Sequence, residues 1–180
     1  MKFQALTITT SAPQTLITLD EAKAQLRVLD EFDDDKIKNC MESAVSYCEG
    51  FLWRSFREQT IVASYSSDGR PFAELFRADF KELLGVRYYD SNNTLQNIDA
   101  ESVVVDSSLF VPRAYFPEPV ASSTIFAPIK IEYTTTPANV SEEIKQAALI
   151  ATAQFYDERD APDMSYVDKI LSSSATRYFL

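Results

Sequence analysis

Apolar residues recur every three or four positions in two long stretches of the chain, which is the spacing of one face of a helix. In residues 141–159 this stripe consists of Ile144, Ala148, Ala151 and Phe155. Ser141 is a suitable N-cap for such a helix, and Pro162 makes further helix unfavourable. The plain interpretation is a central core helix. Because further alanine, leucine and isoleucine residues widen the stripe, we also expect a second packed side, at a subunit interface.

The second stretch, residues 35–56, predicts another long helix. Its apolar face consists of Ile37, Met41, Ala44, Cys48, Phe51 and Leu52. Trp53 and Phe56 near its end either pack inward or mark a contact surface, and we retain them as candidate partner-binding residues. A short amphipathic helix over residues 19–28 precedes it. Thr18 and Glu21 match a capping box at its start.

Between these helices the apolar pattern changes to the alternation typical of strands. Short strands are expected at 60–65, 72–76, 83–89, 94–98, 103–105, 109–111 and 129–134. In the last of them Ile129, Ile131 and Tyr133 should point inward, and Lys130 and Glu132 outward. A further short helix is predicted from residue 165 to 171. Residues 1–14 are interpreted as extended or loosely ordered.

The predicted fold class is α+β and mainly helical. It consists of two long antiparallel helices plus short helices, with a block of short antiparallel strands inserted between the long helices. We expect one domain over residues 1–180. Its helical part is 18–57 and 141–172, its β insertion 59–134, and its C-terminal tail 173–180.

Composition argues against cofactor and metal chemistry. The chain has no histidine and only 3 glycines, so the commonest general base, the commonest metal ligand and glycine-rich phosphate loops are missing. Cys40 and Cys48 would lie ~12 Å apart along one helix, too far for a disulfide. Both are interpreted as buried, reduced and apolar in character. We therefore predict no cofactor, no metal site and no catalytic residue.

Carboxylates offer the remaining enzymatic alternative. Asp157 with Asp160, or the run Asp33 to Asp35, would serve as acid and base if their environments separated their pKa values. The acidic run from Asp30 is better interpreted as a loop with an N-cap at Asp33 or Asp34. A calcium loop is the other alternative, but its D-x-D-x-D-G spacing is missing.

The net charge of −10 argues against a protein that grips nucleic-acid phosphates. It suits a wall past which DNA slides without adhering, although solubility alone also explains it.

No apolar run is long enough for a bilayer, and the first residues do not resemble a signal peptide, so no membrane partner and a cytosolic site of synthesis are expected. The aromatic C-terminal residues Tyr178, Phe179 and Leu180 are candidate partner-binding residues, or else pack on the chain's own core.

Four segments in the same order resemble the head–tail connector (adaptor) proteins of tailed bacteriophages. They are L-D-E-A-K-A-Q-L-R at 19–27, D-D-D-K-I at 33–37 with A-V-S-Y-C-E at 44–49, V-R-Y-Y-D at 86–90, and I-K-Q-A-A at 144–148 with F-Y-D-E-R at 155–159. The chain departs from the family at two turns that favour glycine. Thr134 to Thr136 stand at the first, and Asn92 and Asn93 at the second.

The resemblance implies a structural virion protein at the head–tail junction, made in the host cytoplasm. It would form a homo-oligomeric ring of about twelve subunits. The ring would dock on the portal protein, join it to a downstream stopper or tail-completion protein, and let duplex DNA pass through without specific binding. The alternative is another small head-completion or tail-joining subunit.

Overall fold

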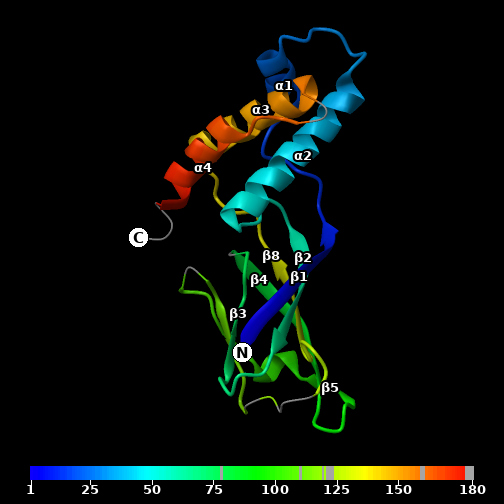
Figure 1. Cartoon of the computed structure of the whole chain (residues 1–180), viewed down its shortest axis with the longest axis vertical. Coiled ribbons are helices and arrows are strands. Elements are labelled where there is room, and N and C mark those ends of the chain that lie inside the picture. Colours follow the sequence, from blue (N-terminus) through cyan, green and yellow to red (C-terminus); the bar gives the residue numbers. More distant parts are fainter. Residues whose placement is uncertain (78, 110, 119, 121–123, 159–160, 177–180) are drawn as a thin grey trace. The chain divides into compact units, whose positions relative to one another are not determined.

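The computed structural model describes residues 1–77, 79–109, 111–118, 120, 124–158 and 161–176. The chain divides into two units, each made of two separated segments (Figure 1). The β unit comprises Met1–Ala12 and Arg57–Pro137, and the helical unit comprises Pro13–Phe56 and Ala138–Leu180. The prediction that the whole chain behaves as one domain stays a prediction.

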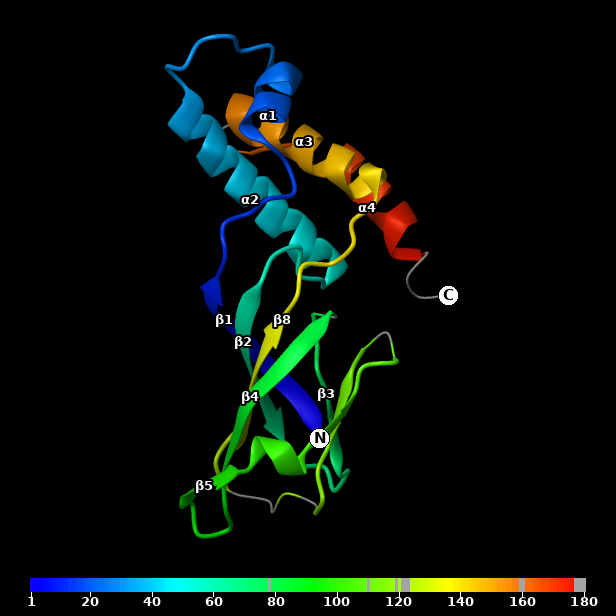
Figure 2. The same cartoon turned by 180° about the vertical axis from the view of Figure 1, so that it is seen from behind.

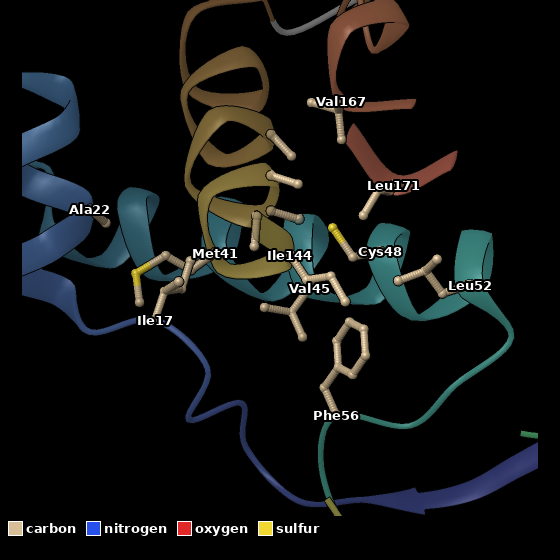
Figure 3. Close-up of a cluster of buried hydrophobic side chains, with 14 of the residues drawn as sticks. Ile17, Ala22, Met41, Val45, Cys48, Leu52, Phe56, Ile144, Val167 and Leu171 are labelled. Carbon is tan, nitrogen blue, oxygen red and sulfur yellow. The ribbon is translucent and has the colours of Figure 1, made fainter. Parts of the chain in front are cut away.

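The helical unit packs three helices around α3. Its helices are α1 (Leu19–Leu26), α2 (Asp34–Leu52), α3 (Glu142–Asp157) and α4 (Ser165–Thr176). Contacts join α3 to each of the other three. Ala147, Ala148 and Ala151 of α3 are fully buried, and their small side chains let the neighbouring helices approach closely. Figure 3 shows Ile144 of α3 beside Val45 and Cys48 of α2, with Val167 and Leu171 of α4 nearby.

The ends of the helices follow local backbone chemistry. The capping box predicted at Thr18 and Glu21 is confirmed, with both reciprocal hydrogen bonds present. Glu21 also accepts a hydrogen bond from the Lys145 ammonium of α3. The second helix ends at Leu52 rather than at Phe56, because Trp53 adopts the left-handed conformation with φ of 52°. Such a residue closes a helix at its C-cap.

The β unit contains two antiparallel sheets. Its strands are β1 (Lys2–Ser11), β2 (Gln59–Ser66), β3 (Phe72–Glu74), β4 (Phe80–Tyr89), β5 (Leu95–Ile98), β6 (Val104–Asp106), β7 (Arg113–Tyr115) and β8 (Ile129–Thr135), with a 3₁₀ turn η1 (Ala100–Ser102). The five-stranded sheet, whose strands are labelled in Figure 2, has the order β1-β2-β8-β4-β5. The three-stranded sheet has the order β3-β7-β6.

One face of the five-stranded sheet forms the core of this unit. The predicted alternation of β8 is confirmed, because Ile129, Ile131 and Tyr133 are buried. Tyr65 of β2 is also buried, and its hydroxyl donates to the Glu74 carbonyl oxygen at 2.6 Å. The Tyr133 hydroxyl donates to the Phe76 carbonyl oxygen at 2.6 Å. Each buried hydroxyl is therefore satisfied by a backbone carbonyl on or next to β3.

The prediction of a mainly helical fold with two long antiparallel helices is wrong. Helices hold 34% of the residues and strands 29%, so the fold is α+β with two antiparallel sheets and without a long helix pair in its described part. The strands are not only an insertion between helices, because β1 precedes α1 and pairs with β2. The sequence pattern did not predict β1 as a strand of the sheet. Most of its residues are exposed, so they lack the apolar alternation of a half-buried strand.

Other boundaries also differ from the sequence prediction. α4 continues to Thr176 and buries Ser174, so the segment from residue 173 begins as helix rather than as a tail. The strand predicted at 109–111 includes Phe110, which lies outside the described residues, and the strand of this region is β7. Within the described residues, no helix combines the length and the apolar character that crossing a membrane requires.

Lowering the pH should weaken the helical unit through Glu21. Hydrogen bonds from Lys145 and from the Thr18 backbone lower the pKa of this carboxyl from 4.5 to about 2. A depressed carboxyl pKa stabilises the fold above the unfolded-state value and loses that contribution as the pH falls through the folded-state value. The urea midpoint should therefore drop between pH 4.5 and 2, and should drop less in Glu21→Gln. Glu118→Gln, at an exposed glutamate, is the control and should follow the wild type.

The two cysteines should be slow to react in the native protein. Both are buried free thiols, and burial raises the pKa of Cys48 to about 12 and also raises that of Cys40. Because thiolates are the reactive form, Ellman's reagent should label Cys40, which is 9% exposed, before Cys48, which is 0% exposed. Unfolding without reductant should release two titratable thiols. Equal, rapid labelling of both in the native state would contradict this burial.

Candidate partner-binding surfaces

The turn between α1 and α2, residues 27–33, is closed at its base by backbone and ionic contacts. Arg27 adopts the left-handed conformation with φ of 56°, and the Val28 N–H donates to the Lys23 carbonyl oxygen at 3.1 Å. The Asp34 N–H donates to the Glu31 carbonyl oxygen at 3.3 Å. The Lys23 ammonium lies 2.7 Å from Asp34, so the ends of α1 and α2 are tied together across the turn.

A second anchor joins this α1–α2 turn to α3. The Tyr156 hydroxyl donates a hydrogen bond to the Asp33 carboxylate, which raises the pKa of Tyr156. The ammonium of Lys36 lies 3.5 Å from the centroid of the Tyr156 ring, within the range of a cation–π contact. The turn is thus held from two sides, and less ordering entropy remains to be lost when something binds it.

The tip of the α1–α2 turn presents two apolar side chains to solvent. Leu29 is 98% exposed and Phe32 94%, more than any other large apolar side chain in the described chain. Asp30 and Glu31 between them are also exposed, and the Asp30 carboxylate accepts from the Phe32 N–H at 3.1 Å. Both views show the turn arching away from the helices (Figures 1 and 2). The sequence interpretation of an acidic loop missed this, although a phenylalanine among carboxylates was its visible signal.

Two of the candidate partner residues named from the sequence, Trp53 and Phe56, are described by the structure, and their environments differ. Trp53 is 52% exposed at the end of α2 and presents part of its indole to solvent. Phe56 is 3% exposed and belongs to the core of the helical unit (Figure 3). Tyr178, Phe179 and Leu180 lie outside the described residues. Of the two residues that the structure describes, Trp53 is partly exposed and Phe56 is buried.

The other face of the five-stranded sheet, opposite its core, carries a depression of about 360 Å³. We call it the sheet depression; its lining includes Val62, Arg87, Tyr89, Leu95, Pro128 and Lys130. Arg87 and Lys130 lie directly opposite each other in the register of β4 and β8. The Arg87 guanidinium is 3.3 Å from Glu132, whereas the ammonium of Lys130 is in no ion pair with any residue that the structure describes.

Three of the carboxylates considered for catalysis, Asp33, Asp34 and Asp35, make contacts near the start of α2. Asp33 accepts from Tyr156, Asp34 pairs with Lys23, and Asp35 lies 3.1 Å from the Lys38 ammonium. Asp157 is exposed, and Asp160 lies outside the described residues. No group of three or more potential metal ligands occurs among the residues with described positions. These contacts give Asp33, Asp34 and Asp35 structural roles at the start of α2.

The sequence matches one family model, that of the phage gp6-like head–tail connector proteins. The match covers residues 16–118, more than half of the chain. It includes α1, α2 and most of the strands, from β2 to β7. No curated protein matches the sequence.

The fold is similar to chains in the neck and virion of gene transfer agent (GTA) particles. A chain in the neck of the empty particle, computed with C6 symmetry, is 17% identical with a TM-score of 0.69, and the match covers 97% of this chain and 95% of that one. A chain in the virion of the native particle is 16% identical with a TM-score of 0.70, and the match covers 97% of this chain and 95% of that one. A chain in the neck of the native particle, computed with C12 symmetry, is 16% identical with a TM-score of 0.69, and the match covers 97% of this chain and 94% of that one. The likeness spans both units of the fold.

Removing the Tyr156 hydroxyl should loosen the α1–α2 turn. Tyr156→Phe deletes the hydrogen bond to Asp33 and leaves the ring under Lys36, so the free energy of unfolding should fall. Limited proteolysis should cut residues 28–33 faster in this variant than in the wild type. Tyr166→Phe removes a hydroxyl from a side chain that is 62% exposed, and should change neither measurement. Equal cleavage of both variants would show that Tyr156 does not anchor the turn.

Proposed function

The chain belongs to the phage gp6-like head–tail connector family, and on this premise we propose that it forms a ring that docks on the portal vertex of a tailed phage. The family is structural, so the chain is a virion structural protein of the head–tail connector type. In the proposed role it joins the portal to a downstream stopper or tail-completion protein and leaves a channel for DNA. The observation that carries the proposal is the family match together with a likeness to neck chains over 97% of the chain.

The proposed assembly is a homo-oligomeric ring. The similar chains belong to necks computed with C6 and C12 symmetry, which supports a ring. The C12 symmetry of one of these necks supports about twelve copies around the portal. Trp53 and the C-terminal residues Tyr178, Phe179 and Leu180 remain proposed partner contacts. Phe56 is left out of this set because it is buried in its own helical unit.

The net charge of −10 fits the passage of duplex DNA through the proposed ring. Carboxylates on a channel wall repel phosphates, so DNA would move without adhering to the protein. In this role the protein works without cofactor, metal or catalysis. Assembly would begin in the host cytoplasm and end in the virion at the head–tail junction. Another position in the same neck, as a head-completion or tail-joining subunit, is the alternative role.

Electron microscopy of the purified chain mixed with its cognate portal tests the proposal. A ring of density should appear on the portal, and deleting residues 177–180 should weaken attachment while the melting temperature stays unchanged, because this deletion spares α4. The triple variant Tyr178→Ser, Phe179→Ser and Leu180→Ser removes the apolar side chains of the tail but keeps its length. It therefore distinguishes the contribution of these side chains from that of tail length. Rings that attach only to a tail-completion protein would favour the alternative role, and no attachment to either would contradict both.

A further inference from the structure

The α1–α2 turn has the features of a recognition element rather than of a simple connector. Its tip exposes Leu29 and Phe32, two large apolar side chains whose burial would be favourable. The base of the turn is held by Tyr156 and by the Lys23–Asp34 pair, so the two apolar side chains are presented from a defined backbone. Asp30 and Glu31 give the same tip two exposed carboxylates. A matching surface needs an apolar socket with positive charge.

The sheet depression of the same chain has those properties. Tyr89, Leu95 and Pro128 supply apolar surface, and Arg87 and Lys130 supply positive charge. Among the described residues that line the depression there is no carboxylate. Like charges directly opposite each other on neighbouring strands are destabilising. Glu132 offsets the charge of Arg87 at 3.3 Å but leaves that of Lys130 without an ionic partner among the described residues. In a chain with net charge −10, such a site favours an acidic ligand.

We propose that the α1–α2 turn of one copy docks into the sheet depression of a neighbouring copy. Phe32 and Leu29 enter against Tyr89, Leu95 and Pro128, and Asp30 and Glu31 meet Lys130 and Arg87. The depression of about 360 Å³ is at the lower end of the range of sites that hold small molecules, a size suited to one or two side chains rather than to a folded element.

A contact of this kind has a consequence for symmetry. The turn and the depression are different surfaces, so each copy offers one and receives the other. Such heterologous contacts build rings when the rotation closes, whereas self-complementary contacts build dimers. The inference rests on the proposed ring and deepens it by naming one of the contacts between adjacent subunits. The contact is one part of a subunit interface, since a stable interface buries about 800 Å² per partner.

Photocrosslinking in assembled necks tests which surface the turn touches. The full chain carries p-benzoylphenylalanine at position 32, and necks are assembled from a mixture of ¹⁵N-labelled and unlabelled chains. After irradiation, mass spectrometry should find position 32 joined to peptides containing residues 87–95 or 128–130 of a different copy. The control places the crosslinker at position 25, an exposed site on α1, and should not label these peptides.

The outcomes separate this inference from the proposed function. Crosslinks from position 32 to the portal, to another neck protein, or only to other segments of this chain would overturn the docking contact and leave the ring intact. A chain that does not enter necks at all would overturn the proposed function instead.

Charge exchange supplies a second test on portal-bound rings. Glu31→Lys and Lys130→Glu should each weaken ring assembly by up to about fivefold, as expected for an exposed charge pair. Phe32→Ala should weaken it roughly thirtyfold, as expected for a central apolar anchor. The double variant Glu31→Lys with Lys130→Glu should recover assembly. All four substituted chains should melt like the wild type, because both charged residues and Phe32 are exposed. A double variant that assembles no better than the single variants would contradict the contact.

Discussion

The close approach of three helices to α3 is the constraint on which the helical unit depends. Ala147, Ala148 and Ala151 carry only a methyl group each and are fully buried, so α1, α2 and α4 can all reach the α3 backbone. Interiors are packed as densely as organic crystals, and larger side chains at these positions would have no space to occupy. Polar side chains of α3 also hold α1 and the α1–α2 turn in place. Lys145 bonds Glu21 of α1, and Tyr156 bonds Asp33 of the α1–α2 turn, so the helix that organises the core also positions the most exposed apolar residues.

The β unit buries one face of its five-stranded sheet and leaves the other face exposed. The alternation of β2 and β8 gives one buried face, and the hydroxyls of Tyr65 and Tyr133 reach backbone carbonyls on or next to β3. The other face is left with side chains such as Val62, Arg87 and Lys130. A sheet with one face committed to a core has a second face available for binding, and here that face is the one carrying adjacent positive charges.

A structural role in a phage neck accounts for the chemistry of the chain better than catalysis does. The carboxylates near the ends of α1 and α2 bind Lys23, Lys38 and Tyr156, and so serve helix ends and the turn. The remaining negative charge gives a repulsive mean field toward nucleic acid. In the proposed ring, the sheet depression would be a local site of attraction within a negatively charged chain. Long-range repulsion of DNA and short-range attraction between subunits are compatible there, because charges farther apart than about 10 Å are largely screened at 0.1 M salt.

The sequence by itself determined the four helices, most of the strands and the family. Local signals were sufficient there: the capping box at Thr18, the alternation in β8, and the apolar stripe of α3. It did not determine β1, whose mostly exposed residues pair with a strand that lies beyond two helices, or the end of α2, where Trp53 takes a left-handed conformation. Nor did it separate the buried Phe56 from the exposed Phe32. Only the tertiary structure decided those points, because burial depends on which distant segments come together, and a local pattern of side chains carries no information about them.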